Sequence, residues 1–390
     1  MIHILEVISD TNMGGAGRLL LARLEKTNRE KIRTTVLLPK GSLLKEELIR
    51  LGIRTVEVVG GADRSLDPIA VLSIVRVIHH LRPDLLHAHG SLSARIAARI
   101  CGVPISIYTR HCAYPLKSWE RLSIVRLMQR WLCDLLSDCV VAVSPAAQKN
   151  LLQLGIRKKR IVQIINGSLP LHRLSEAERS KEKQRLGIPD DAFVVGICAR
   201  LEPCKDHTCF LRAARLLTMQ RNSKQKYRFL IVGDGSLKEE LVRQCHRMGL
   251  SSYTIFTGFL KDPSRVMNLF DINVNCSVGT ETSSLALSEG MSIGVPVVAS
   301  DYGGNVYMVK NGENGFLYHK GNSSMLADRI RFIAKNPRLR KEMSIKAKAR
   351  YERELNAEAM TKQYERLYQL LVERKQQDQE KLKKKLARGR

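Results

Sequence analysis

Residues 193–205 read Phe-Val-Val-Gly-Ile-Cys-Ala-Arg-Leu-Glu-Pro-Cys-Lys. The first seven residues are almost entirely apolar, as expected of a strand that helices cover on both faces of a parallel sheet. Arg200 and Lys205 follow at once, so they should lie at the carboxyl end of that strand, where open α/β sheets bind ligands. An arginine fork and a lysine point charge together suit a diphosphate, although a chain this basic can also place two cations on one loop by chance.

The alternation of short apolar runs with helical stretches continues in both directions from this strand. Helical periodicity at residues 44–51 and 69–81 separates apolar runs of the first half. This is the βαβ pattern of a doubly wound α/β fold. The sequence predicts strands at residues 3–9, 34–38, 55–59, 85–89, 105–109, 140–144, 193–199, 229–232, 253–257, 272–276, 295–300 and 316–319.

The length of 390 residues suggests two domains. A polar stretch around residues 167–183 interrupts the alternation and marks their boundary. We therefore expect one α/β domain over residues 1–170 and a second over 171–355. Residues 356–376 lack glycine and proline and predict a helix that returns to the first domain, and a basic, disordered tail is expected at 377–390.

The balance of 65 basic and 38 acidic residues gives a net charge of +27. Such a field attracts polyanions, namely nucleic acid, anionic lipid or phosphorylated substrates, and a solvated basic surface without a partner is the alternative. The nine cysteines include no Cys-x-x-Cys pair, which favours reducing cytosol over a disulfide framework or a zinc site. No apolar run approaches the roughly 18–20 residues of a membrane-spanning helix, and the N-terminus reads as a strand rather than a signal peptide.

Two glutamates bracket the segment Glu281-Thr-Ser-Ser-Leu-Ala-Leu-Ser-Glu289, which follows the expected strand at 272–276. If a helix begins at Glu281, its eight-residue rise of about 12 Å is close to the distance from a sugar ring to the ribose of a nucleotide sugar. The amides of residues 282–285 would then face the diphosphate between them. The alternatives are a helix cap followed by an exposed acid, or the paired carboxylates of a glycosidase.

A glycine-rich turn, Gly14-Gly-Ala-Gly17, follows the first expected strand and opens a helix. Glycine lets the backbone approach a phosphate, and the helix N-terminus adds a favourable dipole. The pattern is not Gly-x-Gly-x-x-Gly, so a dinucleotide-binding domain is not supported, and a plain turn explains the glycines equally well.

In this order, these segments resemble glycosyltransferase family 4, also called the glycosyl transferases group 1. The resemblance covers nearly the whole chain and implies the GT-B fold, in which two Rossmann-like domains face each other across a cleft. The first domain would bind the acceptor and the second the nucleotide sugar. Further motifs that carry the resemblance are His87-Ala-His89-Gly90, Thr109-Arg-His111, Val143-Ser-Pro145, Ile165-Asn-Gly167, Val232-Gly-Asp-Gly235, Phe256-Thr-Gly258, Gly294-Val-Pro-Val-Val298, Asp301-Tyr-Gly-Gly304 and Asn314-Gly315.

The resemblance also implies a role for each matching residue. Arg200 and Lys205 would hold the donor diphosphate and stabilise its charge as it leaves. Glu289 would bind the ribose hydroxyls, Glu281 would lie near the transferred sugar, and His111 would contact that sugar close to the reacting centre. Further donor contacts are implied for Gly14, Gly15, Asp234, Thr282, Ser283, Ser284 and Leu285.

Members of this family retain the anomeric configuration, which implies front-face attack with the departing phosphate taking the acceptor's proton. The chain has no Asp-x-Asp motif, which agrees with a metal-independent mechanism and no cofactor beyond the nucleotide-sugar co-substrate. His87 and His89 should point to one side of a strand and could bind a metal, but a structural or site-wall pair is favoured.

Two positions depart from the family pattern. Thr282-Ser-Ser284 stands where the family often has Gly-Phe-Gly, which puts the identity of the donor in doubt. Tyr307 stands where the family often has a glutamate, so that contact is not carried over. The expected activity is sugar transfer in the synthesis of a bacterial surface polysaccharide or a lipid-linked glycan.

Residues 118–136 predict a helix that carries basic residues and two tryptophans. Such a helix suits an anionic membrane surface, but packing on the first sheet is favoured because an apolar strand follows at 140–144. A cytoplasmic protein, peripheral on the membrane through its charge, is the working hypothesis. The predicted inner side of the helix consists of Leu122, Val125, Leu132 and Leu136, and the basic and aromatic residues are Trp119, Arg121, Arg126, Arg130 and Trp131.

Two other classes of function compete with sugar transfer. A nucleotide-sugar epimerase or hydrolase could use the same fold, because fold does not determine the reaction. A polyanion-binding protein is suggested by charge alone. Nucleic acid is not an expected partner, because the chain lacks interleaved aromatic residues and any recognised nucleic-acid module.

Overall fold

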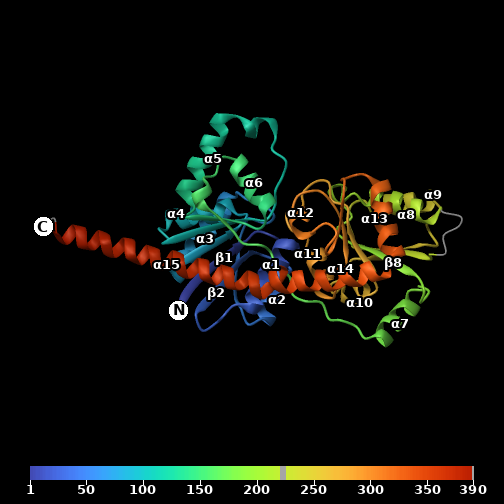
Figure 1. Ribbon diagram of the computed structural model, residues 1–390. Helices are drawn as coiled ribbons and strands as arrows, with labels where there is room; N and C mark the ends of the chain where they lie inside the picture. The colour runs from blue at the N-terminus through green and yellow to red at the C-terminus, as the bar shows by residue number, and fades with distance from the viewer. Residues whose placement is uncertain (220–224, 389–390) are drawn as a thin grey trace. The chain divides into compact units, whose positions relative to one another are not determined.

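The computed structural model describes residues 1–219 and 225–388, with side chains up to residue 381 and at residue 384. The chain divides into two compact units, coloured by chain position in Figure 1. Unit 1 combines Met1–Gly167 with Ala357–Arg390, and unit 2 is Ser168–Asn356. Each unit is built around one parallel sheet, so the predicted α/β fold with two Rossmann-like sheets is confirmed.

Unit 1 contains a seven-stranded parallel sheet with strand order β3-β2-β1-β4-β5-β6-β7. Its strands are β1 Ile2–Ile8, β2 Ile32–Pro39, β3 Arg54–Val58, β4 Leu85–His89, β5 Ile105–Arg110, β6 Cys139–Ala142 and β7 Ile161–Gln163. Its helices are α1 Gly15–Lys26, α2 Leu44–Arg50, α3 Pro68–Leu81, α4 Leu92–Ile100, η1 Ser118–Arg121, α5 Ser123–Leu136, α6 Pro145–Gln153, η2 Lys158–Arg160 and α15 Ala357–Arg388.

The sheet of unit 1 is buried on both faces because successive residues of a strand point in opposite directions. Leu37 of β2 packs in a core cluster with α3 and α4. Its neighbours Val36 and Leu38 pack in a second cluster with α1 and α2. Helices therefore cover both faces, which explains why the strands read as continuous apolar runs.

Unit 2 contains a six-stranded parallel sheet with strand order β10-β9-β8-β11-β12-β13. Its strands are β8 Phe193–Cys198, β9 Tyr227–Val232, β10 Thr254–Gly258, β11 Ile272–Asn275, β12 Val297–Ser300 and β13 Gly315–Tyr318. Its helices are α7 Glu176–Arg185, η3 Pro203–Lys205, α8 His207–Thr218, α9 Lys238–Arg247, α10 Ser264–Met267, α11 Leu285–Ser292, α12 Asn305–Met308, α13 Ser323–Lys335, α14 Pro337–Arg350 and the π-helical η4 Tyr351–Leu355.

The strand order of unit 2 reverses at β8. From β8 the chain adds β9 and β10 on one side and then returns to add β11 on the other. The connections after β8 and β11 therefore leave the sheet in opposite directions, and this switch point is where open α/β sheets bind ligands.

Strand β7, at the edge of the first sheet, was not predicted. It has only three residues, Ile161-Val-Gln163, directly after the basic run at 157–160. So short a run lacks the alternation that identifies a strand from sequence.

Helix α15 corrects the expectation of a disordered C-terminal tail. The disordered tail expected at 377–390 is wrong as far as the structure describes it, because α15 continues to Arg388, and residues 389–390 lie outside the described residues. The tail up to Arg388 contains only residues that a helix accepts, with no glycine or proline. Asn356, extended at φ −95° and ψ 156°, separates α15 from the helices that end unit 2.

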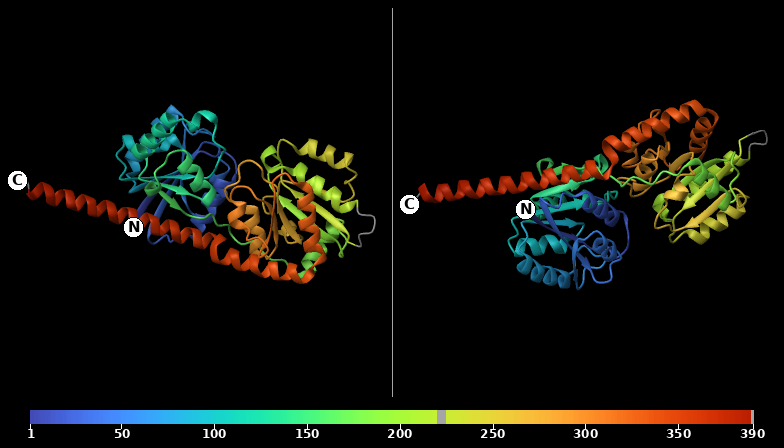
Figure 2. Two further views of the ribbon diagram at one scale, coloured as in Figure 1. Left: turned by 45° about the horizontal axis from the view of Figure 1, so that its top comes forward. Right: turned by 90° about the horizontal axis from the view of Figure 1, so that it is seen from below.

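Helix α15 is attached to unit 1 by buried side chains. Tyr364 and Tyr368 are buried, and the Tyr368 hydroxyl accepts a hydrogen bond from Arg23 of α1 at 2.6 Å. Thr361 donates to the backbone carbonyl of Arg23 at 3.3 Å. The last turns of α15 project beyond the rest of unit 1, as both views of Figure 2 show.

Candidate active site

The loop after β8 carries the cations that the sequence singled out. Arg200 is exposed in this loop, whereas Lys205 ends the short η3 helix and reaches inward. The Lys205 Nζ lies 2.7 Å from the Glu281 carboxylate. The structure therefore brings together Lys205 and Glu281 across the switch point of the unit 2 sheet.

The Glu281 carboxylate is held by three polar groups. It accepts hydrogen bonds from Lys205, from Asn275 Nδ2 at 3.1 Å and from Ser277 Oγ at 2.8 Å. Only 5% of Glu281 is exposed. Burial raises the pKa of this carboxyl, but Lys205 and the two hydrogen bonds outweigh burial and lower the pKa below its ordinary value. Glu281 is therefore a fixed anion beside a fixed cation.

Two glycines hold the backbone of the Glu281 loop. The Gly304 amide donates to the Glu281 carbonyl at 2.9 Å. A Cβ on Gly303 would lie 2.0 Å from the Glu281 carbonyl oxygen, and one on Gly304 would lie 1.8 Å from that of Thr282. Neither contact is sterically allowed. Glycines at 303 and 304 therefore let this segment lie directly against the backbone of the Glu281 loop.

The predicted start of the helix at Glu281 is wrong. Helix α11 begins at Leu285, and the Ser284 side chain caps it by accepting from the Leu287 amide at 3.3 Å. Serine is a better N-cap than glutamate, and the glycine contacts keep residues 281–282 in the loop. The 12 Å rise expected between the two glutamates therefore does not apply, because Glu281 lies outside the helix.

Glu289 lies inside α11 and is only 5% exposed. This excludes the alternative in which it is a surface acid beyond a helix cap. Its neighbour Ser288 donates to Ser168 Oγ at 2.8 Å, so the segment that enters unit 2 packs on the same helix. The amides of the first turn of α11, starting at Leu285, lie between the two glutamates along the chain.

Asp234, an expected donor contact, lies in the loop after β9. It is exposed and pairs with Lys238 of α9 at 2.8 Å. The glycines beside it pack on the Arg200 loop, because a Cβ on Gly233 would lie 2.0 Å from the Ala199 carbonyl oxygen. The backbone of the Val232-Gly-Asp-Gly235 motif therefore supports the loop that carries Arg200 and Lys205.

Tyr307, at the position where the sequence departs from the family pattern, has partners within unit 2. Its hydroxyl donates to the Glu354 carboxylate at 2.8 Å. The guanidinium of Arg350 lies 5.0 Å from the centre of the tyrosine ring. The side chain thus ties α12 to the end of α14 and to η4.

In unit 1, Gly14 and Gly15 stand at the N-terminus of α1, as predicted. Packing explains the next glycine, because a Cβ on Gly17 would lie 2.6 Å from Leu44 of α2. Nothing lies within 4 Å of a Cβ placed on Gly15. Sterics therefore do not account for Gly15, and close approach of a ligand to the backbone stays a prediction.

The carboxyl ends of β1, β4 and β5 carry a hydrogen-bonded chain in which Glu6 and His89 are buried and His111 is half-buried. Glu6 pairs with Arg23 at 2.6 Å and bonds His89 Nε2 at 2.7 Å. His89 Nδ1 lies 2.9 Å from His111 Nε2. His87 is a side branch of this chain, because its Nδ1 lies 3.2 Å from Glu6 Oε2 and 2.8 Å from the Tyr368 hydroxyl. Glu6 was not predicted as a site residue, although a charged residue inside an apolar strand indicates a buried partner.

The electrostatics of this cluster favour neutral His87 and His111 beside the Glu6–Arg23 ion pair. Burial lowers the pKa of His87 to about 4 and lowers that of His111 well below its ordinary value. Burial opposes ionisation of Glu6, but Arg23 and His87 lower the pKa of its carboxyl well below the ordinary value. Ligand atoms of Glu6, His87 and His89 lie within 4.8 Å of one another. Because Arg23 already neutralises Glu6, the group suits a hydrogen-bonded network better than a metal centre.

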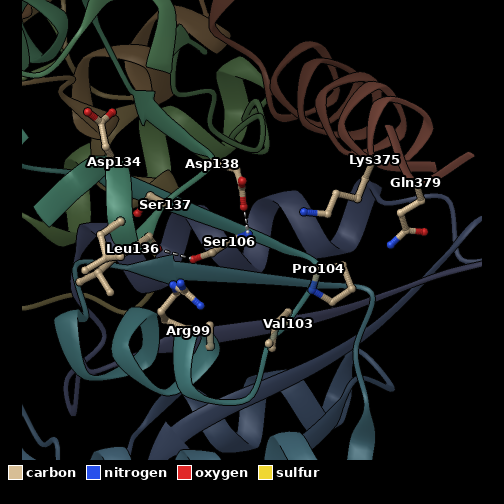
Figure 3. Close-up of a pocket in the computed structure, with 13 residues that line it drawn as sticks. Arg99, Val103, Pro104, Ser106, Asp134, Leu136, Ser137, Asp138, Lys375 and Gln379 are labelled. Atoms are coloured by element: carbon tan, nitrogen blue, oxygen red, sulfur yellow. Dashed lines mark hydrogen bonds between the residues drawn. The ribbon is translucent and has the colours of Figure 1, made fainter. Parts of the chain in front are cut away.

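A pocket of about 340 Å³ lies at the amino ends of the strands of the same sheet, opposite to the ends that carry His89 and His111. Figure 3 shows Pro104 and Ser106 at the start of β5, Asp138 just before β6, and Lys375 and Gln379 from α15 around it. These residues stand at the amino ends of the strands, away from the edge where such sheets bind ligands. The pocket is therefore not part of the candidate site.

Helix α5 differs from the packing expected of it. Cys133 and Leu136 are buried, and Cys133 packs in a core cluster with β6, but Leu122, just before the helix, is exposed. Trp119 and Trp131 are 53% and 63% exposed. A second apolar side faces solvent at helical spacing, and we call it the outer face of α5: Ile124, Leu127, Met128, Trp131 and Leu135. Among the described residues, no helix is long and apolar enough to cross a membrane.

Comparisons with known proteins match both units. The family model described as Glycosyltransferase Family 4 matches residues 13–168. The model described as Glycosyl transferases group 1 matches residues 178–350. The two matches follow each other along the chain, one in each unit.

Relatives and solved structures agree with these matches. The chain is 28% identical over 258 residues to the UDP-Gal:alpha-D-GlcNAc-diphosphoundecaprenol alpha-1,3-galactosyltransferase of Escherichia coli, which covers 64% of this chain and 65% of that protein. It is 24% identical over 286 residues to the 2-deoxystreptamine glucosyltransferase of Streptomyces kanamyceticus, with 69% and 72% covered. A crystal structure of Anabaena HepE with UDP and glucose has a TM-score of 0.81 at 25% identity, with 95% and 100% covered. The chain therefore belongs to the glycosyltransferases of family 4, group 1, with the GT-B fold.

Proposed function

We propose that this glycosyltransferase moves a sugar from a nucleotide-sugar donor to a glycan or lipid-linked acceptor, with retention and without a metal. The observation that carries the donor assignment is the Lys205–Glu281 pair at the switch point of the unit 2 sheet. Anabaena HepE, similar over 95% of the chain, is described with UDP and with UDP-glucose. The Escherichia coli relative is named for a diphosphoundecaprenol acceptor.

On the donor side, each residue acts through its own chemistry. Lys205 and Arg200 attract the diphosphate, and the amides at the start of α11 add hydrogen-bond donors to it. Glu289 accepts hydrogen bonds from the ribose hydroxyls. Glu281, held as an anion, orients the sugar hydroxyls and keeps Lys205 in place when no donor is bound.

In the transfer step, negative charge grows on the departing diphosphate. Cations that are already in place stabilise that charge without any rearrangement of the site, which is an effective form of electrostatic catalysis. The bond from the anomeric carbon to the diphosphate oxygen breaks while the acceptor oxygen bonds to the same face. The departing phosphate oxygen takes the acceptor's proton, so no separate base is needed.

A donor panel tests this proposal. Thermal stability of the protein is measured with UDP, GDP, ADP and their sugars, and the best donor is then incubated with a lipid-linked sugar acceptor. We expect stabilisation by one nucleotide series and a product with the donor's anomeric configuration, unaffected by EDTA. Binding without transfer to any acceptor, but with a new free sugar or an epimer, would favour the epimerase or hydrolase alternative.

The outer face of α5 supports a membrane location for the acceptor. Exposed tryptophans beside arginines are typical of helices that lie in an anionic interface, and Arg126 and Arg130 are exposed along one flank of α5. The net charge of +27 acts in the same direction, with about 1 kcal/mol for each basic residue near the leaflet. We therefore infer a peripheral enzyme on the cytoplasmic side of the membrane.

Vesicle co-sedimentation tests the membrane location. The wild type should bind phosphatidylglycerol vesicles at low salt and bind phosphatidylcholine vesicles much less. The double variant Leu127→Ser with Trp131→Ser should bind several-fold less. Phe259→Ser in unit 2, where the phenylalanine is 65% exposed, is the matched control and should bind like the wild type. Equal loss in both variants, or no binding by the wild type, would refute the role of α5.

A further inference from the structure

We propose that Glu6 and His89 are positioning residues that hold His111 in one tautomer, with the proton on Nε2 and a lone pair on Nδ1. The three side chains come from β1, from β4 and from the residue after β5, so they lie far apart in sequence. Their contacts form one continuous chain inside unit 1.

The chain starts at the Glu6 carboxylate, and each of its two oxygens has a hydrogen-bond partner. Glu6 Oε1 accepts from the Arg23 guanidinium at 2.6 Å, and Glu6 Oε2 lies 2.7 Å from His89 Nε2. Tyr368 supports the arrangement, because its hydroxyl accepts from Arg23 at 2.6 Å and lies 3.3 Å from Glu6 Oε1. An ionised carboxylate can only accept hydrogen bonds, so His89 Nε2 must carry a proton.

The protonation state of His89 follows from charge balance. Glu6 and Arg23 are fully buried and already neutralise each other. An imidazolium at His89 would add an unpaired positive charge to this buried cluster, which is costly at low dielectric. His89 is therefore a neutral donor at Nε2 and an acceptor at Nδ1.

The hydrogen bond between His89 and His111 determines the tautomer of His111. His89 Nδ1 can only accept, and it lies 2.9 Å from His111 Nε2. The hydrogen bond between them therefore needs the proton on His111 Nε2. A neutral imidazole has one proton, so His111 Nδ1 is left as an acceptor.

This tautomer restricts which ligand groups can form a hydrogen bond with His111 Nδ1. An acceptor nitrogen binds a hydroxyl, whereas a phosphate oxygen needs a donor. On the proposed function, His111 Nδ1 accepts a hydrogen bond from a hydroxyl of the transferred sugar and takes no part in binding the diphosphate. Glu6 and His89, the first and second members of the chain, act only through His111.

The experiment is ¹⁵N-detected histidine NMR on the full-length protein. His89 and His111 should both show the neutral tautomer protonated at Nε2, near neutral pH. His89→Leu should release His111 into a mixture of tautomers. His89→Gln should keep the Nε2 tautomer, because its amide NH can replace the donor to Glu6 and its oxygen the acceptor from His111. His79→Gln, at an exposed position on α3 away from this chain, is the matched control and should leave His111 unchanged.

Kinetics give the second readout. His89→Leu should lower kcat about 10- to 100-fold, with little change in the donor KM, and His89→Gln should restore most of the loss. A wild-type His111 protonated at Nδ1, or a charged His89, would overturn the assignment, and so would the same kcat in His89→Leu and His89→Gln. An inactive wild type with the predicted tautomers would instead contradict the proposed function and leave the assignment standing.

Discussion

At the scale of single residues, Lys205 and Glu281 form an ion pair at 2.7 Å. Replacing either residue therefore also removes the charge partner of the other. Lys205→Ala removes a cation that we assign to the leaving diphosphate, so kcat should fall about 100-fold or more. It also leaves the buried Glu281 anion without its partner, at a cost of about 1–3 kcal/mol in stability. Turnover and urea denaturation measure the two effects separately.

The double variant Lys205→Ala with Glu281→Gln provides the control. Neutralising the glutamate should recover most of the lost stability, because no unpaired charge then remains in the site. Activity should stay low, since the cation is still missing. If activity returned together with stability, Lys205 would be a structural residue and not part of the donor site.

Glu281 should also make the stability of the protein depend on acid pH. Its pKa is lower in the folded state than the ordinary value of 4.5. The ionised group therefore stabilises the fold above about pH 4.5, and this contribution is lost as the pH falls through the folded-state pKa. Glu281→Gln should show a smaller loss of stability between pH 6 and pH 3 than the wild type. Parallel curves for the two proteins would contradict the lowered pKa.

At the scale of elements, helix α15 has two parts with different roles. Its first part buries Tyr364 and Tyr368 against α1 and the Glu6 cluster. The last ten residues of the chain, KLKKKLARGR, contain six basic and no acidic residues. The first part should therefore serve stability and the last part electrostatic attraction.

Truncation after residue 376 separates these roles. The melting temperature should change little, because the tyrosines that anchor the helix are retained. Binding to phosphatidylglycerol vesicles at low salt should weaken, since each basic residue near an anionic leaflet contributes about 1 kcal/mol. The full chain at high salt is a useful control, because screening should bring its binding down to that of the truncated protein. A large drop in melting temperature would show that the basic part is structural.

At the scale of the whole molecule, the chain crosses between its units twice, so only unit 2 is continuous. Residues 168–356 contain the complete six-stranded sheet and its core. Unit 1 needs α15 to cover Arg23 and Glu6, which are buried together with Tyr368. Expressed alone, residues 168–356 should therefore fold cooperatively, whereas residues 1–167 without α15 should not.

Nucleotide binding by the isolated fragment makes this prediction functional. If the donor site lies within unit 2, the fragment of residues 168–356 should be stabilised by the nucleotide that stabilises the full chain. Transfer activity should be absent, because His111 belongs to unit 1. A folded fragment that binds no nucleotide would mean that the donor site needs residues from both units.

Much of the architecture could be read from the sequence because it depends on local patterns. The apolar runs at 85–89 and 193–199 predicted strands that the structure places at β4 Leu85–His89 and β8 Phe193–Cys198. Burial on both faces of a parallel sheet leaves this signature directly in the chain. Strand β7 and the helical tail were not predicted, the first because it is so short and the second because its composition suits both helix and disorder.

What the sequence by itself determined was the type and order of the elements and which loops follow which strands, since periodicity and loop position are local properties. Only the tertiary structure decided which side chains meet. The close approach of Gly303 and Gly304 keeps Glu281 out of α11 and beside Lys205. Glu6, His89 and His111 touch because β1, β4 and β5 are neighbours in the sheet. Such contacts depend on strand order and on backbone distances below those that a Cβ allows, and no local pattern encodes either.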